Sequence, residues 1–173
     1  MLKALFILAV MVTSPALAAK GPCKGVNVEQ DAFSKKEVAS ANGRIWARYW
    51  LDWEARSEEG SPRLKLILVK AELHEVPLDT GYEVLLLLGE GTVHPLATSE
   101  QTAAVAGANE NGVYTTWPAE FSLSKQDLID LSMRPITAIR AELPGGEANW
   151  TVKKGMQKKL MQVFGCFAGK LKE

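Results

Sequence analysis

Alternating apolar and polar residues predict that most of this chain forms β-strands. The clearest example is the segment 63–73, which has leucines at positions 64, 66 and 68. Lysine, isoleucine and valine stand between and after them, so the segment combines a period of two residues with β-branched content, and both are typical of strands. The same pattern, bounded by turn residues, predicts further strands at 82–89, 92–97, 113–123, 136–143 and 147–152.

Two segments carry helical signals instead. Ser124 and Asp127 form a capping-box pattern, with Asp in place of the usual Glu, and predict a short helix at about 124–133. Pro135 ends it, because the residue before a proline avoids helical angles. A second, amphipathic helix is predicted at about 155–168. Its apolar stripe consists of Met156, Leu160, Val163, Phe164 and Phe167.

The aromatic-rich stretch 44–56 allows two interpretations. A helix would place Trp46, Trp50 and Trp53 on one stripe, whereas a strand would divide them between two faces. The next six residues, 57–62, have a turn composition, and a strand follows them. Strand, polar turn and strand make a hairpin, so the sequence favours the strand interpretation.

That interpretation makes one face of the stretch a candidate binding surface. Tyr49 and Trp53 would turn inward, while two tryptophans would form a flat aromatic face among charged side chains. Such a face could bind a sugar or a partner protein, unless a second layer of the fold buries it as well. The predicted ligand-binding residues are Trp46, Arg48, Trp50 and Asp52.

Two regions show little regular alternation of apolar and polar residues. The segment 20–43 is interpreted as mostly loop, with at most a short strand at Val26 and Val28, and Asn42-Gly43 as a turn pair. The segment 98–112 is interpreted as a loop or an irregular edge strand. Taken together, the pattern predicts an α+β fold, a mostly antiparallel β-sheet or small sandwich built from hairpins, with one short helix and a C-terminal amphipathic helix.

The start of the chain has the composition of a targeting segment. Lys3 precedes an apolar run at 4–12, which is too short to span a bilayer, and small residues follow at 16–19. This pattern predicts a signal peptide at 1–19 rather than a buried N-terminal helix. The remaining residues, 20–173, are expected to form a single globular domain that is exported to the periplasm or the extracellular space.

The two cysteines stand near opposite ends of the expected mature chain. Cys23 and Cys166 lack the CxxC spacing of redox or metal sites. In an oxidising compartment such a pair is expected to form a disulfide rather than two free thiols. The bond would join the N-terminal segment to the C-terminal helix.

Charge is unevenly distributed, although the chain has 20 basic and 20 acidic residues. The segment 52–120 holds twelve acidic residues against four basic ones, whereas 153–173 holds six lysines and one glutamate. Solvated strand and helix faces explain this polarity more simply than a function does. An acidic middle and export disfavour nucleic-acid binding. A weak contact with an anionic surface would use Lys154, Lys158 and Lys159.

No motif in the sequence identifies a reaction. The serine-hydrolase elbow, the dinucleotide and phosphate loops, HExxH and the calcium loop are all missing. His74 and His94 are interpreted as ordinary surface histidines, so the sequence predicts no metal and no cofactor. Asp52 and Glu54 would stand about 7 Å apart on one strand face. That spacing suits a glycosidase pair, but any solvated strand offers it.

These observations favour a non-enzymatic binding or accessory protein of the cell envelope. It would act through a protein or glycan partner, without a transmembrane segment once the signal peptide is removed. The alternative is a carboxylate-dependent hydrolase of envelope glycan or peptide, although no catalytic residue can be assigned. A purely structural subunit of a complex is a third possibility. A concave cleft with convergent acids would favour the hydrolase.

Overall fold

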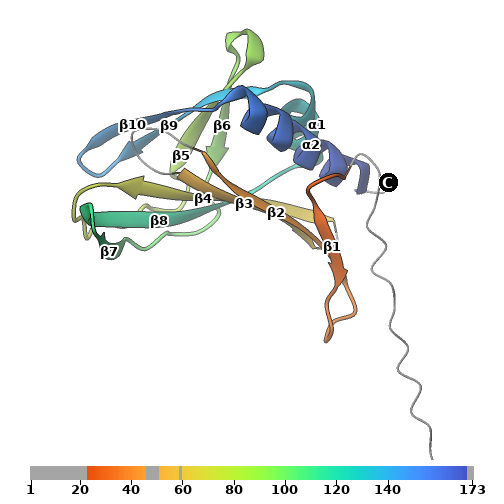
Figure 1. Cartoon of the computed structure of the whole chain (residues 1–173), viewed down its shortest axis with the longest axis horizontal. Coiled ribbons are helices and arrows are strands. Elements are labelled where there is room, and N and C mark those ends of the chain that lie inside the picture. The colour runs from red at the N-terminus through yellow and green to blue at the C-terminus, as the bar shows by residue number, and fades with distance from the viewer. Residues whose placement is uncertain (1–22, 46–50, 59, 171–173) are drawn as a thin grey trace, which may run out of the picture.

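The protein consists of two antiparallel β-sheets and two α-helices (Figure 1). The structure is a computed structural model that describes residues 23–45, 51–58 and 60–170. The larger sheet has six strands in the order β1 (Asn27–Gln30), β2 (Glu37–Ile45), β3 (Leu51–Glu58), β4 (Ser61–Lys70), β8 (Gly112–Ser122) and β7 (Val105–Asn109). The smaller sheet has four, in the order β10 (Gly146–Thr151), β9 (Ile136–Leu143), β5 (Glu83–Leu88) and β6 (Val93–Ala97).

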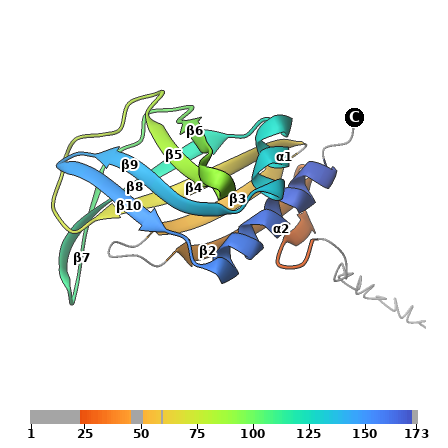
Figure 2. The ribbon, with the colours of Figure 1, turned by 90° about the horizontal axis from the view of Figure 1, so that it is seen from above.

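Both helices lie on the same side of the six-stranded sheet as the four-stranded sheet (Figure 1). Helix α1 spans Lys125–Met133 and α2 spans Lys154–Lys170, while a short 3-10 helix, η1, occupies Gly89–Gly91. Figure 2 shows α1 and α2 side by side at one end of the molecule, with β7 at the other end. This layering covers one face of the six-stranded sheet, and the other face points away from the rest of the fold.

One hydrophobic core fills the space between the two layers. Trp53 from β3, Trp117 from β8 and Trp150 from β10 are each at most 2 % exposed. Phe164 and Phe167 of α2 are fully buried, as the apolar stripe of that helix predicts. These large aromatic side chains bury the most area per residue and therefore contribute much of the stability of the fold.

The fold class predicted from the sequence is confirmed. All six strands expected from residue 63 onward are present within a few residues of their predicted bounds, as are both helices. Ser124 caps α1 by accepting a hydrogen bond from the backbone of Asp127, whose carboxylate in turn accepts one from the backbone of Ser124. The uncertain segment 98–112 supplies β7, an edge strand.

The prediction that 20–43 is mostly loop is wrong, because β1 and most of β2 lie there. Asn42 and Gly43 belong to β2 and form no turn. Two inward positions of β2 are the alanines Ala39 and Ala41, so its hydrophobic pattern is weak. At Gly43 an added Cβ would lie 2.8 Å from Nε1 of Trp53. Glycine is therefore required at this position for close packing against the indole.

The interpretation of 44–56 as one strand is also wrong. Ile45 of β2 and Leu51 of β3 lie opposite each other in an antiparallel pair, so the stretch contributes to two strands. The expected inward residues that the structure describes are buried, with Trp53 2 % exposed and Ala55 fully buried. Residues 46–50, with their two tryptophans, lie outside the described part of the chain.

A disulfide joins the two ends of the described chain, as the sequence predicts. Cys23 and Cys166 are bonded, with Cα atoms 4.9 Å apart and 143 residues of separation. Cys166 is buried in α2, so the bond attaches the segment before β1 to the C-terminal helix. Among the residues that the structure describes, no helix is long and apolar enough to cross a membrane. The predicted signal peptide lies outside those residues.

Candidate functional site

The outer face of the six-stranded sheet carries the charged side chains of its central strands. Along β3, buried Trp53 and Ala55 alternate with Glu54, Arg56 and Glu58, because successive side chains of a strand point to opposite faces. Strands β4 and β8 follow the same alternation. The strand pairing therefore collects charges from distant parts of the sequence on one open surface.

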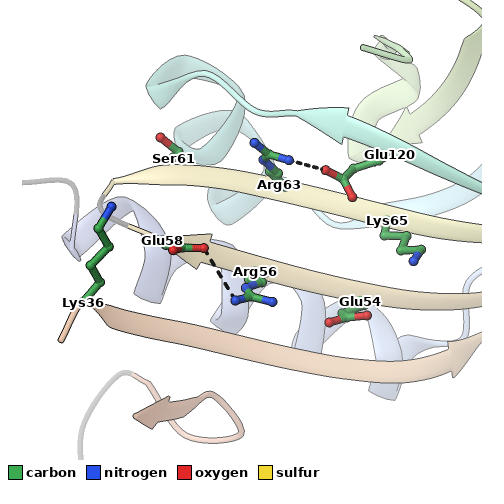
Figure 3. Close-up of a pocket in the computed structure, with 8 residues that line it drawn as sticks. All are labelled: Lys36, Glu54, Arg56, Glu58, Ser61, Arg63, Lys65 and Glu120. Atoms are coloured by element: carbon green, nitrogen blue, oxygen red, sulfur yellow. Dashed lines mark hydrogen bonds and ion pairs between the residues drawn. The ribbon is translucent and has the colours of Figure 1, made fainter. Parts of the chain in front are cut away.

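A hollow of about 590 Å³ lies on this face (Figure 3). Eight described side chains line it, and all are polar or charged: four are basic, three are acidic and one is a serine. We call this hollow and its lining residues the charged hollow. The lining residues are Lys36, Glu54, Arg56, Glu58, Ser61, Arg63, Lys65 and Glu120.

Two arginines stand directly opposite each other in the charged hollow. Arg56 of β3 and Arg63 of β4 are register partners in the antiparallel pair. Each also contacts an acid: Arg56 lies 3.5 Å from Glu58, and Arg63 donates to Glu120 over 2.7 Å. The hydrogen bond to Glu120 raises the pKa of Arg63 above its ordinary value. Like charges at opposed positions repel, so these acids reduce an unfavourable contact.

The predicted binding residues can be placed only in part. Asp52 lies on the same face as the charged hollow, two positions before Glu54 on β3. Its carboxylate accepts from two nitrogens of Arg44, over 2.6 Å and 3.1 Å. Trp46, Arg48 and Trp50 lie outside the described residues, so the predicted aromatic face stays a prediction.

Several residues of the charged hollow were missed by sequence reasoning. The alternation of β3 and β4 was readable, and a hairpin between them would have predicted that Arg56 and Arg63 share a face. Glu120 lies more than fifty residues away, and its position depends on the pairing of β4 with β8. No local pattern in the sequence carries that information.

The acids of the charged hollow do not converge on one point. Glu58 turns toward Arg56 and Glu120 toward Arg63, while Glu54 stands apart (Figure 3). Asp52 and Glu54 likewise do not face one point, because the carboxylate of Asp52 accepts a hydrogen bond from Arg44. A glycosidase requires two carboxyl groups that face one scissile bond, and this arrangement does not provide them.

The two histidines occupy separate places. His74 Nε2 lies 3.2 Å from Glu72, and its ring lies 5.8 Å from that of Trp117. His94 Nε2 lies 3.0 Å from Asp127 in an ion-pair contact without hydrogen-bond geometry. Within the described ranges, no group of three or more histidine, cysteine or acidic residues could hold a metal ion.

The lysines of α2 differ in their surroundings. Lys159 donates to the backbone oxygen of Asn42 over 2.7 Å, and its ammonium group lies 5.4 Å from the centre of the Trp53 ring. It therefore helps to fix α2 on β2 through a hydrogen bond and a cation–π contact. Lys154 and Lys158 are exposed, so of the three lysines they are the ones best placed to meet an anionic surface.

A second hollow of about 410 Å³ opens beside Tyr82. Burial raises the pKa of Tyr82 to about 12, and the nearby carboxylate of Glu142 adds to the effect. Its described lining residues include Asp79, Tyr82, Glu142, Pro77 and Pro144, and none of the described lining residues is basic. The charged hollow is larger and combines basic with acidic side chains, so it is the stronger candidate.

Comparisons of the chain with models of protein families, with curated proteins and with solved structures find no match.

Proposed function

We propose that this chain is an exported, non-enzymatic binding protein that holds a glycan on the outer face of its six-stranded sheet. The observation that carries the proposal is the charged hollow, an open concave surface whose described lining residues are all polar or charged. Ligand sites are concave and fix their ligands with a small number of well-placed polar groups.

The lining favours a glycan over a protein partner. Protein interfaces have a buried centre that is depleted in charge and enriched in aromatic residues. Among the residues that the structure describes, none that lines the charged hollow is apolar or aromatic. Sugar hydroxyls both donate and accept hydrogen bonds, so they can bind the carboxylate of Glu54 and the ammonium group of Lys65 at once.

Two features support export to the periplasm or the extracellular space. The first is the predicted signal peptide at 1–19. The second is the disulfide between Cys23 and Cys166, because disulfides persist in oxidising compartments and are rare in the cytosol. A binding protein of the cell envelope is consistent with both.

Binding of the mature protein to an array of envelope glycans tests the proposal. We expect binding that Glu54→Gln and Lys65→Gln each weaken about tenfold, as the loss of a hydrogen bond to a charged group predicts. Glu147→Gln is the matched control, because Glu147 is an exposed acid on the other sheet and pairs with Arg140. Absence of binding to every glycan, or equal binding by all three variants, would overturn the proposal.

A further inference from the structure

We infer that the glycan is acidic and that its acid group binds between Arg56 and Arg63. This inference rests on the proposed function and adds the chemical class of the ligand. Side chains at opposite positions of an antiparallel pair have Cβ atoms about 4.5–5.5 Å apart. The two guanidinium groups can therefore reach one anion together, and the anion removes the repulsion between them.

The ion pairs of these arginines leave room for a ligand. Arg44 holds Asp52 with two nitrogens, over 2.6 Å and 3.1 Å, in the fork that arginine forms with a carboxylate. Arg63 makes one hydrogen bond to Glu120, and Arg56 lies 3.5 Å from Glu58, so neither pair forms such a fork. The side chains of Arg56 and Arg63 are 52 % and 58 % exposed, so their other donors face the open hollow.

The charge distribution of the chain points the same way. The segment 52–120 contains only four basic residues, and three of them line the charged hollow: Arg56, Arg63 and Lys65. Lys36 adds a fourth basic side chain from the segment before β2. Basic groups are thus concentrated at one place in an otherwise acidic region, which would draw an anionic ligand to the hollow.

The remaining lining groups suit the rest of a sugar. Glu54 and Ser61 lie on the same face as the two arginines, on β3 and β4. Their oxygens can accept hydrogen bonds from hydroxyl groups beside the bound acid. An acidic peptide offers far fewer hydroxyl groups to these oxygens, so a saccharide matches the lining better.

Calorimetric titration of the mature, disulfide-bonded protein tests the inference. The probes are a short oligogalacturonate and the same oligomer with its carboxyl groups reduced to alcohols. We expect the acidic oligomer to bind at least about tenfold more tightly, because charge-assisted hydrogen bonds are the stronger ones. Added salt should weaken the acidic oligomer much more than the reduced one. A sulfated oligosaccharide distinguishes a carboxylate from a sulfate as the acid group, and tight binding of either supports the inference.

The variants Arg56→Gln and Arg63→Gln should each weaken acidic binding about tenfold and leave the reduced oligomer unaffected. Arg140→Gln is the matched control, because Arg140 is 57 % exposed and contacts Glu147 over 3.4 Å on the other sheet. Arg56→Lys keeps the charge without the fork and should recover part of the affinity. Unchanged thermal unfolding of each variant shows that the fold is retained.

Three outcomes would overturn the inference, and they separate it from the proposed function. The first outcome is that both oligomers bind equally, and that their binding depends on Glu54 but on neither arginine. It would disprove that the ligand is acidic and would leave the proposal of glycan binding intact. Tighter binding of oligoglutamate than of any acidic saccharide would disprove the glycan class. Failure of every saccharide would reject both proposals.

Discussion

A close contact between Gly43 of β2 and the indole of Trp53 limits which residue can occupy this position of the strand. Gly43 places its backbone against the indole of Trp53, which is 2 % exposed and forms part of the core. A methyl group there would come within 2.8 Å of Nε1. The indole is held between this strand and Lys159 of α2, so it has little freedom to move aside.

Gly43→Ala is therefore expected to lower the free energy of unfolding by about 1–3 kcal/mol, the usual cost of overpacking a core. Gly165→Ala is the control. Its new Cβ would lie 3.6 Å from Cβ of Ser132, an ordinary contact, and alanine favours the interior of α2 by up to about 1 kcal/mol. Urea unfolding measures both variants. Equal stability of Gly43→Ala and the wild-type chain would contradict the packing argument.

At this scale the sequence was informative about which side chains face the core. Alternation identified Trp53 as inward-facing and Glu54 as outward-facing, because a strand has a fixed period of two. It could not reveal that Gly43 carries a packing role, since nothing in the local pattern shows that Trp53 will lie against it.

The side chain of Asp31 makes several of the hydrogen bonds that close the turn between β1 and β2. Asp31 accepts hydrogen bonds from the backbone of Phe33 over 3.0 Å and from that of Ser34 over 2.6 Å. The bonds from Ser34, followed by the one from Phe33, lower the pKa of Asp31 below its ordinary value of 3.8. The turn carries Phe33, which is 97 % exposed, so hydrogen bonds and not the packing of this side chain order it.

Because the folded-state pKa of Asp31 is lowered, its contribution to the turn is present above the unfolded pKa and is lost as pH falls through the folded pKa. We expect the amide proton shifts of Phe33 and Ser34 to titrate together with a midpoint below 3.8. NMR titration measures this midpoint. Asp31→Ala should remove the transition from both amides, and a midpoint at or above 3.8 in the wild-type chain would contradict the prediction.

At the scale of elements, prediction succeeded where the pattern was strong. Helix α1 was found from Ser124 and Asp127 because a capping box is a local signal. Strands β1 and β2 were missed because the first is exposed throughout and the second has small or polar residues at most of its positions. The stretch 44–56 was interpreted as one strand because its alternation of apolar and polar residues continues from the end of β2 at Ile45 to β3, which begins at Leu51.

The disulfide acts on the molecule as a whole. Cys23 and Cys166 lie 143 residues apart in the sequence. The loop that they close contains every strand that the structure describes, together with α1. A loop of this length restricts the unfolded chain strongly. It also ties the N-terminal segment to the buried side of α2, where Cys166 is 2 % exposed.

Reduction of this bond is expected to lower the free energy of unfolding by about 2–5 kcal/mol. Urea unfolding with and without a reductant measures the difference. The double variant Cys23→Ala with Cys166→Ala controls for other effects of the reductant, because it should unfold at one midpoint in both buffers. Identical midpoints for the wild-type chain in the two buffers would contradict the prediction.

The overall layering was only partly predictable. Hairpins and two helices indicated an α+β fold, but they did not indicate how ten strands divide between two sheets. The charged hollow depends on that division, because Glu120 of β8 reaches Arg63 only through the pairing of β8 with β4. A binding surface that is assembled from several strands in this way can be identified only from the tertiary structure.

The bond between Cys23 and Cys166 also determines what a proteolytic cut would do to the molecule. Proteases cut exposed connections, and 71–77 contains exposed Leu73 and Val76 between β4 and β5. A single cut in 71–77 would divide the chain into a piece that contains Cys23 and a piece that contains Cys166. The disulfide would still join the two pieces. Both pieces would stay packed around the same core, so the outer sheet face could persist after the backbone has been broken.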